Sequence, residues 1–201
     1  MMFRVASSFK TVYRKSSTMV TNNNVSLFQI PVNLGQQLLG PDKAPALLLE
    51  HGLEGVLESS GWNVKKLPVI DSHGLVYENP NSTPNAKNCD EVGKICERAY
   101  NAILEEAKTD NFLLILGGDH CIPIGTIPAI IEARKSVGVV WVDAHADINT
   151  PEGSESKNMH GMPVSFLMGL ANAASLPSMG WFKPCLKPED IVYIALRDLD
   201  P

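Results

Sequence analysis

The stretch that decides the fold is VGVVWVDAHAD, residues 137–147, in which an apolar run turns directly into a polar cluster. Two further runs are nearly as apolar and also end in polar residues: Phe112–Leu116 leads into GGDH, and Ile191–Leu196 leads into RDLDP. Strands without polar alternation are usually covered on both faces, as in a parallel sheet flanked by helices. We therefore predict an α/β fold with an open parallel sheet, whose ligands bind beyond the carboxyl ends of the strands.

The rest of the chain alternates short apolar runs with stretches of helical pattern. Further strands are expected at residues 25–30 and 62–69, and further helices at 42–59, 124–133 and 162–174. Asp42 is expected to cap the first of these helices, and Gly52 and Gly55 to interrupt it. Residues 71–87 are rich in Asn, Ser and Pro, which predicts a loop.

The helix with the clearest sequence signals follows Asn88. Glu91 stands three residues after Asn88, which predicts a capping box, and Asp90 adds negative charge where a helix N-terminus favours it. Apolar residues then recur at helical spacing: Val92, Ile95, Cys96, Ala99, Ile103 and Ala107. We expect this stripe, including Cys96, to face the core.

Composition excludes several classes of protein. The chain has 201 residues, of which 44% are hydrophobic and 19% charged, as expected for a globular protein with a sizeable core. The net charge of −5 argues against nucleic acid as the main partner. No apolar stretch reaches the roughly 18 residues of a membrane span. The four cysteines form no C-x-x-C pair, which argues against a disulfide framework or a zinc ribbon.

The amino-terminal segment differs from the rest in charge. Residues 1–41 contain no Asp or Glu, and the first twenty carry four basic residues among serines and apolar residues. This pattern is typical of an organellar transit peptide, so we predict mitochondrial import directed by residues 1–24. The alternative is a disordered terminus on a cytoplasmic protein, and a reporter fused to residues 1–24 would distinguish them. Residues 25–201 are expected to form one α/β domain.

The polar cluster at 143–147 has the pattern of a metal site. In extended backbone, the spacing of Asp143, His145 and Asp147 places all three side chains on one face. His120, from a neighbouring strand end, would add a fourth ligand. An oxygen-rich set of this kind favours a hard ion such as Mn²⁺ over structural zinc. Cys121 is expected to be a small buried neighbour of the site and not a ligand.

The loop at 149–161 follows the metal-ligand cluster, where loops often recognise substrate. Its Asn and Ser side chains could hydrogen-bond a carboxylate, and Lys157 would add positive charge. His160 is a candidate proton shuttle, because the pKa of an imidazole lies near neutrality. Ser154 and Lys157, each taken alone, are expected to be solvated loop residues.

These motifs together resemble the arginase family of ureohydrolases. The resemblance rests on GGDH at 117–120, on DAHADINTP at 143–151 and on NMHG at 158–161. The run DAHADINTP followed by HGMPVSFL resembles arginases more specifically than other ureohydrolases. The resemblance covers roughly residues 25–201 and is strongest over 112–170.

The resemblance implies a binuclear Mn²⁺ site. By their positions in the family motifs, His120 and Asp147 would bind one ion and His145 the other, with Asp143 bridging the two. The ions would lower the pKa of a bridging water, and the resulting hydroxide would attack the guanidinium carbon of L-arginine to give L-ornithine and urea. Asp147 would pass a proton to the departing amine, and His160 matches the proton-shuttling histidine.

The resemblance also implies how the substrate is held. Asn149, Ser156 and Asn158 match positions that bind the α-carboxylate of arginine, and Asp200 matches the residue that faces the α-amino group. His145 is placed among the substrate-binding residues as well as the metal ligands. L-Arginine is thus the expected small-molecule partner, and a homo-oligomer is one assembly that the sequence leaves open.

The chain departs from the family pattern in one respect. The family has a second Asp-x-Asp pair on a later strand, whereas this sequence stops at Pro201, and the pair Asp198/Asp200 matches the substrate-side motif instead. We therefore expect a fragment or a truncation, with a sheet that is incomplete at its C-terminal side, an exposed apolar edge, and no activity of the isolated chain. One alternative is an agmatinase-like ureohydrolase, against which Asn149 and Ser156 argue. Another is a non-catalytic paralogue that binds metal weakly or caps a full-length partner.

Overall fold

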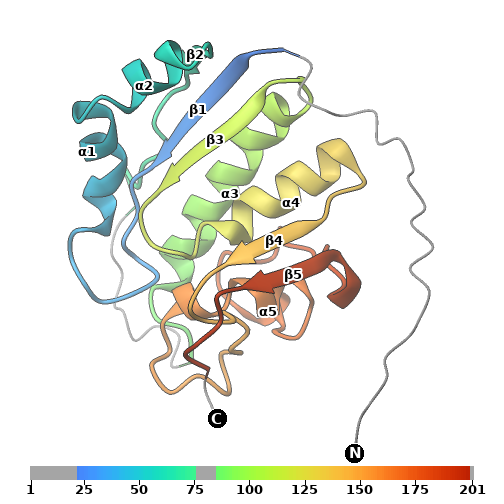
Figure 1. Ribbon diagram of the computed structural model, residues 1–201. Coiled ribbons are helices and arrows are strands. Elements are labelled where there is room, and N and C mark those ends of the chain that lie inside the picture. The colour runs from blue at the N-terminus through green and yellow to red at the C-terminus, as the bar shows by residue number, and fades with distance from the viewer. Residues whose placement is uncertain (1–21, 76–84, 200–201) are drawn as a thin grey trace, which may run out of the picture.

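In the part of the chain that the structure describes, five parallel strands lie among the helices (Figure 1). The computed structural model describes residues 22–75 and 85–199. The strands are β1 (Asn24–Ile30), β2 (Asn63–Lys66), β3 (Phe112–Gly117), β4 (Val139–Val142) and β5 (Ile191–Ile194). One sheet has the order β2-β1-β3 and the other pairs β4 with β5, and all pairings are parallel. The predicted α/β class with a parallel sheet is confirmed, in the form of two separate parallel sheets.

The carboxyl ends of the strands lie at one edge of the molecule. The arrowheads of β1, β3, β4 and β5 all point toward the same end in Figure 1. In the first sheet Ile30 is paired with Gly117, and in the second Val142 is paired with Ile194. The polar segments that follow β3, β4 and β5 are therefore delivered to one side of the molecule.

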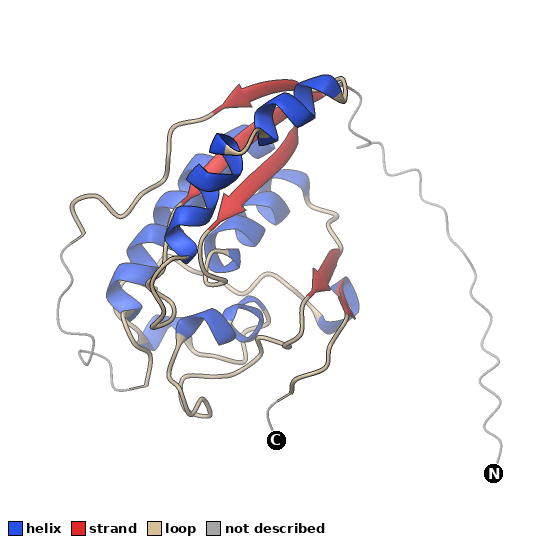
Figure 2. Ribbon diagram, turned by 60° about the vertical axis from the view of Figure 1, so that its left-hand side comes forward, coloured by secondary structure: helices blue, strands red, loops and turns tan. Residues whose placement is uncertain are grey.

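Alternate residues of β1 contact two different apolar clusters. Val25 and Leu27 pack with α1 (Ala44–Glu50) and α2 (Leu53–Ser59), and Phe28 and Ile30 pack with α3 (Cys89–Ala107) and α4 (Pro123–Arg134). Figure 2 shows helix in front of the strands of the first sheet and further helices behind them. Because side chains alternate across a strand, this arrangement covers both faces of the sheet, as predicted.

The second sheet is covered on one face only. Trp141 is buried, but its neighbours Val140 and Val142 are 63% and 68% exposed. On β5, Val192 and Ile194 are 59% and 49% exposed. The prediction of cover on both faces is therefore wrong for β4 and β5 in the described part of the chain. The exposed side chains of Val140, Val142, Val192 and Ile194 form an apolar surface, which we call the β4–β5 face.

The first helical region is divided where the sequence predicted a break. Gly52 adopts a left-handed conformation with φ of 91° and directly precedes α2, whereas Gly55 lies inside α2. Left-handed backbone is available to glycine without strain, which accounts for the break at this position. The expectation that Asp42 caps a helix is wrong: Asp42 lies in a short 3-10 helix, η1 (Pro41–Lys43), and accepts a hydrogen bond from the Gly40 N–H.

Helix α3 has the predicted buried stripe but a different start. All six predicted stripe residues are buried, and Cys96 is among them. Asn88 adopts a left-handed conformation (φ 52°), and its side chain makes no capping hydrogen bond. Instead, Asn88 Nδ2 donates to the carbonyl of Leu34 at 2.8 Å. At the contact with α4, a Cβ on Gly125 would lie 2.2 Å from the Cys96 carbonyl, so only glycine allows these helices to approach so closely.

The region after β4 contains short elements only. They are η2 (Met159–Gly161), α5 (Pro163–Leu167), η3 (Ala173–Ser175) and η4 (Pro188–Asp190). The helix predicted over 162–174 is thus limited to α5 and η3, and Gly169, with φ of 73°, follows the end of α5. Within the predicted loop at 71–87, the described residues form no helix or strand. The remaining residues of this loop lie outside the described residues, and so does most of the predicted transit segment. None of the described helices is both long and apolar enough to cross a membrane.

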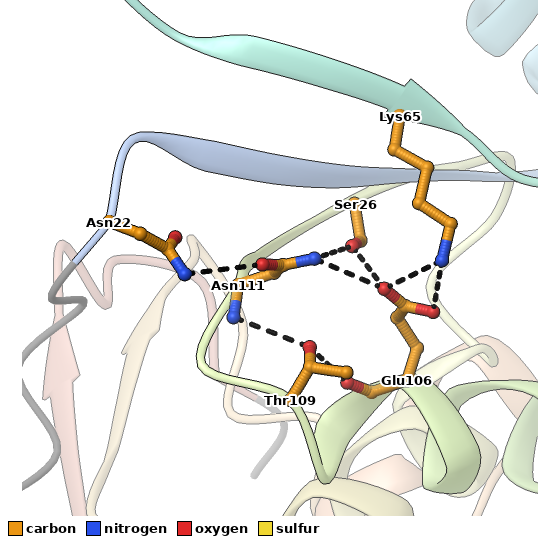
Figure 3. Close-up of polar contacts among 6 residues, drawn as sticks. All are labelled: Asn22, Ser26, Lys65, Glu106, Thr109 and Asn111. Carbon is orange, nitrogen blue, oxygen red and sulfur yellow. Dashed lines mark hydrogen bonds and ion pairs between the residues drawn. The ribbon is translucent and has the colours of Figure 1, made fainter.

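A polar network ties the end of α3 to β1 and β2 (Figure 3). Glu106 accepts hydrogen bonds from Ser26 Oγ at 2.5 Å and from Lys65 Nζ at 2.9 Å. Asn111 Nδ2 donates to Ser26 Oγ at 3.0 Å and to Glu106 Oε1 at 3.3 Å. Only 12% of the Glu106 side chain is exposed, so its charge requires these partners. The network lies at the end of the first sheet away from the predicted metal ligands.

Candidate active site

Three predicted metal ligands meet beyond β3 and β4. His120 Nδ1 lies 2.6 Å from Asp147 Oδ2 and 3.1 Å from Asp143 Oδ2. One ligand atom from each of the three residues lies within 4.8 Å of the other two. We call these residues the His120/Asp143/Asp147 cluster. Two carboxylates and an imidazole drawn from two strand ends form the kind of set that binds a divalent cation.

Asp143 occupies the middle of this arrangement. Its Oδ2 faces His120, and its Oδ1 accepts a hydrogen bond from the backbone N–H of His145 at 2.9 Å. Burial works against ionisation of Asp143, but the His145 N–H and the two imidazoles outweigh it and lower the pKa of this carboxyl. Asp143 is therefore held as a carboxylate that has one oxygen toward each histidine.

The half-buried imidazole of His120 lies among carboxylates that shift its pKa. Burial alone would lower the pKa of this imidazole, but the carboxylates of Asp147, Asp143 and Asp119 raise it above its ordinary value. The ring also packs on Trp141 of β4, with the two centroids 4.7 Å apart. These contacts fix His120 against the carboxylates.

The burial of Asp147 provides a test of whether this set suits a cation. Asp147 is only 8% exposed, and its Oδ2 has no hydrogen-bond donor in proper geometry among the described residues, despite the short contact with His120. Its backbone φ is 49°, a conformation that few residues other than glycine adopt without cost. A buried carboxylate oxygen without a donor is unfavourable unless a cation compensates it. The residues present therefore fit a bound divalent cation.

The GGDH turn is held in place by Asp119. The buried Asp119 carboxylate accepts hydrogen bonds from the Gly35 N–H at 2.8 Å and the Cys121 N–H at 2.9 Å. A Cβ on Gly118 would lie 1.8 Å from the Val32 carbonyl, so this glycine is required for the close approach of two backbone segments. Cys121 is fully buried, and its contacts with Cys96 together with burial raise the pKa of its thiol. Cys121 is thus a buried neighbour, as predicted.

His145 does not join the His120/Asp143/Asp147 cluster. The prediction that residues 143–147 continue as extended backbone is wrong, because β4 ends at Val142 and the Asp143 carboxylate bends the chain by accepting the His145 N–H. The His145 ring is 58% exposed, with Nδ1 3.4 Å from Asp143 Oδ1 and Nε2 3.3 Å from Asp198 Oδ2. It therefore stands beside Asp143, on the side away from His120.

The cluster opens into a cavity of about 950 Å³. Seven of the predicted site residues line this cavity: His120, Asp143, His145, Asp147, Asn149, Ser156 and His160. The backbone N–H of His160 donates to the Gly35 carbonyl at 2.9 Å, which fixes the position of the 158–161 segment. Most of the site residues that the sequence predicted therefore line one cavity on the carboxyl side of the strands.

Two predicted substrate residues are not among the cavity-lining residues. Asn158 packs into the loop, where its N–H donates to Ser156 Oγ at 3.3 Å and its Oδ1 is buried without a hydrogen-bond donor among the described residues. Asp200 lies outside the described residues. The α-amino contact assigned to Asp200 therefore stays a prediction.

The loop residues Ser154 and Lys157 are not solvated as expected. Ser154 is 4% exposed, and its Oγ accepts the Lys157 N–H at 3.0 Å. Lys157 Nζ donates to the Pro151 carbonyl at 3.1 Å and to the Glu152 carbonyl at 3.4 Å. Lys157 thus braces its own loop and is not among the residues that line the cavity.

Sequence reasoning did not identify two polar residues that contact the site. Tyr193 Oη donates to the Ala146 carbonyl at 2.9 Å, and burial together with the charge of Asp147 raises the pKa of Tyr193 to about 12. Asp198 lines the cavity and lies beside His145. The RDLDP motif at the end of β5 was a signal for Asp198, but the spacing alone does not show which aspartate faces His145.

Comparison with known proteins identifies the family. Residues 23–201 match the arginase family. The chain is 39% identical to the arginase of Saccharomyces cerevisiae over 194 residues, which covers 89% of this chain and 58% of that protein. It is 41% identical to arginase-1 of Xenopus laevis over 183 residues, covering 89% and 57% of the two proteins. The chain therefore spans well under two thirds of the length of the curated relatives it matches.

Solved structures show the same relationship. The arginase of Entamoeba histolytica, crystallised with L-ornithine, superposes with a TM-score of 0.77 at 35% identity, over 89% of this chain and 60% of that one. An arginase from Bacillus subtilis gives 0.73 at 33% identity, over 89% and 58%. A putative agmatinase from Clostridium difficile gives 0.57 at 15% identity, a likeness of fold alone. From its sequence, its fold and the residues at its strand ends, this chain belongs to the arginase family.

Proposed function

We propose that this chain carries the metal-dependent site of an arginase, which hydrolyses the guanidinium group of L-arginine to L-ornithine and urea. The observation that carries the proposal is the His120/Asp143/Asp147 cluster, whose unsatisfied carboxylate oxygen lies in a cavity that Asn149 and Ser156 also line. Membership of the family and the arginase relatives support the same reaction.

His120, Asp143 and Asp147 would hold the cation, and we propose Mn²⁺ because the set is rich in carboxylate oxygen. When bound, a divalent cation lowers the pKa of water toward neutrality, which provides a hydroxide nucleophile for the unreactive guanidinium carbon. Asp143 has one oxygen toward His120 and the other toward His145, which suits it to serve two ions.

The cavity residues complement the parts of arginine. The carboxylates of Asp143 and Asp147 attract the positive guanidinium group, and the hydrogen-bonding side chains of Asn149 and Ser156 suit the α-carboxylate. Asp147, a member of the same cluster, would hold the proton for the departing amine. His160 lines the same cavity, and we propose that it exchanges protons with solvent.

The described residues offer only three mutually close ligands, which is few for a pair of cations. We therefore propose that the 201-residue chain alone binds Mn²⁺ weakly and turns over little arginine. Both halves of this proposal are measurable on the purified chain.

The proposed function is tested by urea release. The purified chain is incubated with MnCl₂ and either L-arginine or agmatine, and urea is measured against a variant that carries Asp143→Ala and Asp147→Ala. The proposal predicts that any urea released comes from arginine and is absent in the double variant. Faster release from agmatine would contradict the substrate assignment, and equal release by the double variant would contradict the site.

A further inference from the structure

Asp198 pairs with the side chain of His145, and the proposed function gives Asp198 no role. Asp198 Oδ2 lies 3.3 Å from His145 Nε2. The two residues follow β5 and β4 respectively, and both line the cavity. Neither belongs to the His120/Asp143/Asp147 cluster, so their contact has to be explained separately.

Backbone hydrogen bonds hold the two segments together. Beyond the last paired residues of β4 and β5, the Asp143 N–H donates to the Ile194 carbonyl at 3.1 Å. The Ala144 carbonyl then accepts both the Arg197 N–H at 2.9 Å and the Asp198 N–H at 3.0 Å. The carbonyl immediately before His145 is thus bonded to the backbone of Asp198. This pairing keeps the Asp198 side chain opposite His145, although 79% of that side chain is exposed.

The two side-chain contacts of His145 suit one of its ring nitrogens to a cation. A neutral imidazole has one nitrogen that donates and one that accepts. Both nitrogens face carboxylates, which only accept: Nε2 faces Asp198 and Nδ1 faces Asp143. When a cation lies beside Asp143, the proton belongs on Nε2, where Asp198 accepts it. Nδ1 then presents its lone pair, and it lies 3.4 Å from Asp143 Oδ1, on the side of the ring that faces the cation cluster.

We propose that Asp198 is a positioning residue for the metal site, which holds His145 by its Nε2–H so that Nδ1 serves as a further cation ligand beside Asp143. Histidines that bind metals commonly donate their other N–H to a carboxylate, and loss of that partner weakens metal binding. The inference rests on the proposed function, since it requires a cation at the cluster. It assigns Asp198 a role through His145 and not a direct contact with the cation or the substrate.

The test is a double-mutant cycle on Mn²⁺ affinity, measured by titration calorimetry on the full 201-residue chain. The four proteins are the parent chain, Asp198→Ala, His145→Ala and the double variant. We expect Asp198→Ala to weaken Mn²⁺ binding about 10–100-fold in the parent chain. In the His145→Ala background the same change should cost no more than about twofold, because the residue through which Asp198 acts is gone.

Asp110→Ala is the matched control. Asp110 is exposed in the turn between α3 and β3. Its replacement by Ala removes the same charge as Asp198→Ala, but at a position away from the site. Its Mn²⁺ affinity should stay within about twofold of the parent value. Circular dichroism confirms that each variant keeps the parent fold.

Three results would overturn the inference. An equal loss of affinity in both backgrounds would mean that Asp198 acts on the cation directly or by charge alone, and the proposed function would stand. No loss in the parent background would remove the role of Asp198 and also leave the proposed function intact. Absence of Mn²⁺ binding by the parent chain would overturn the proposed metal site and the role of Asp198 with it.

Discussion

Nδ1 of His120 lies 2.6 Å from Oδ2 of Asp147, although the two residues follow different strands. Such a contact requires the ends of β3 and β4 to converge, which the parallel arrangement provides. The burial of Asp147 makes its negative charge costly unless a positive charge, from the imidazolium form of His120 or from a cation, lies beside it. The cation proposed for this site would resolve that cost, and the predictions below follow from the same geometry.

Replacing Asp143 by Ala should weaken Mn²⁺ binding more than replacing any other residue of the site. Asp143 contacts both His120 and His145, so its loss removes a ligand and disturbs two others. Loss of a supporting residue costs about 10–100-fold in affinity, and loss of a direct ligand should exceed that range. Titration calorimetry of Asp143→Ala and Asp110→Ala measures the difference. Similar affinities for these two variants would contradict the site.

The core of α3 should be sensitive to truncation. Ile103 is fully buried between the sheet and the helices, and Ile103→Ala should lower the free energy of unfolding by about 2–5 kcal/mol. Leu39 is 89% exposed, so Leu39→Ala should change it by less than about 0.5 kcal/mol. Urea unfolding followed by circular dichroism gives both values. A loss at Leu39 as large as that at Ile103 would argue against the described core.

The Glu106 network should make stability depend on pH. Burial raises the pKa of Glu106, but hydrogen bonds from Ser26, Lys65 and Asn111 outweigh it and hold the pKa below its ordinary value of 4.5. A lowered pKa in the folded state stabilises the fold above the ordinary value, and this contribution is lost as the pH falls through the lowered one. Glu106→Gln should therefore be less stable than the parent chain near neutrality, with a difference that shrinks below about pH 4.5.

Urea unfolding of the parent chain and Glu106→Gln at several pH values measures this effect. Glu58→Gln is the control, because Glu58 is exposed on α2 and should show a small difference at every pH. A Glu106→Gln difference that stays constant or grows on acidification would show that the charge of Glu106 does not stabilise the fold.

The β4–β5 face should bind apolar probes. Val140 and Val192 are paired across the two strands, and both are more than half exposed. A contiguous exposed apolar surface promotes self-association. The double variant Val140→Lys/Val192→Glu places opposite charges side by side, so it should bind less of the dye ANS and associate less at high concentration. If Leu39→Lys lowered dye binding equally, the β4–β5 face would not be the binding surface.

The sequence predicted where strands and helices lie along the chain better than it predicted the local geometry at the turns between them. Apolar runs fixed the positions of β3, β4 and β5, because burial of such runs is the main favourable term in folding. The helical spacing from Val92 to Ala107 likewise predicted α3 and its buried side. These features depend on residues close together in the sequence.

The missed features depend on partners that are distant in the sequence. Asn88 donates to the Leu34 carbonyl in place of capping α3, and nothing near Asn88 identifies that partner. His145 turns toward Asp198 because the chain bends after β4, whereas the regular spacing of 143–147 predicted one shared face. The exposure of the β4–β5 face could not be read from composition, since buried and exposed valines are alike in sequence.

The central claim is that His120, Asp143 and Asp147 bind a divalent cation. The most direct test is an anomalous-difference map from crystals of the chain grown with MnCl₂, with data collected on both sides of the manganese absorption edge. The account predicts a manganese peak in contact with the Nδ1 atom of His120 and with carboxylate oxygens of Asp143 and Asp147. A map with no peak at these side chains, at a Mn²⁺ concentration that saturates the chain in solution, would contradict it.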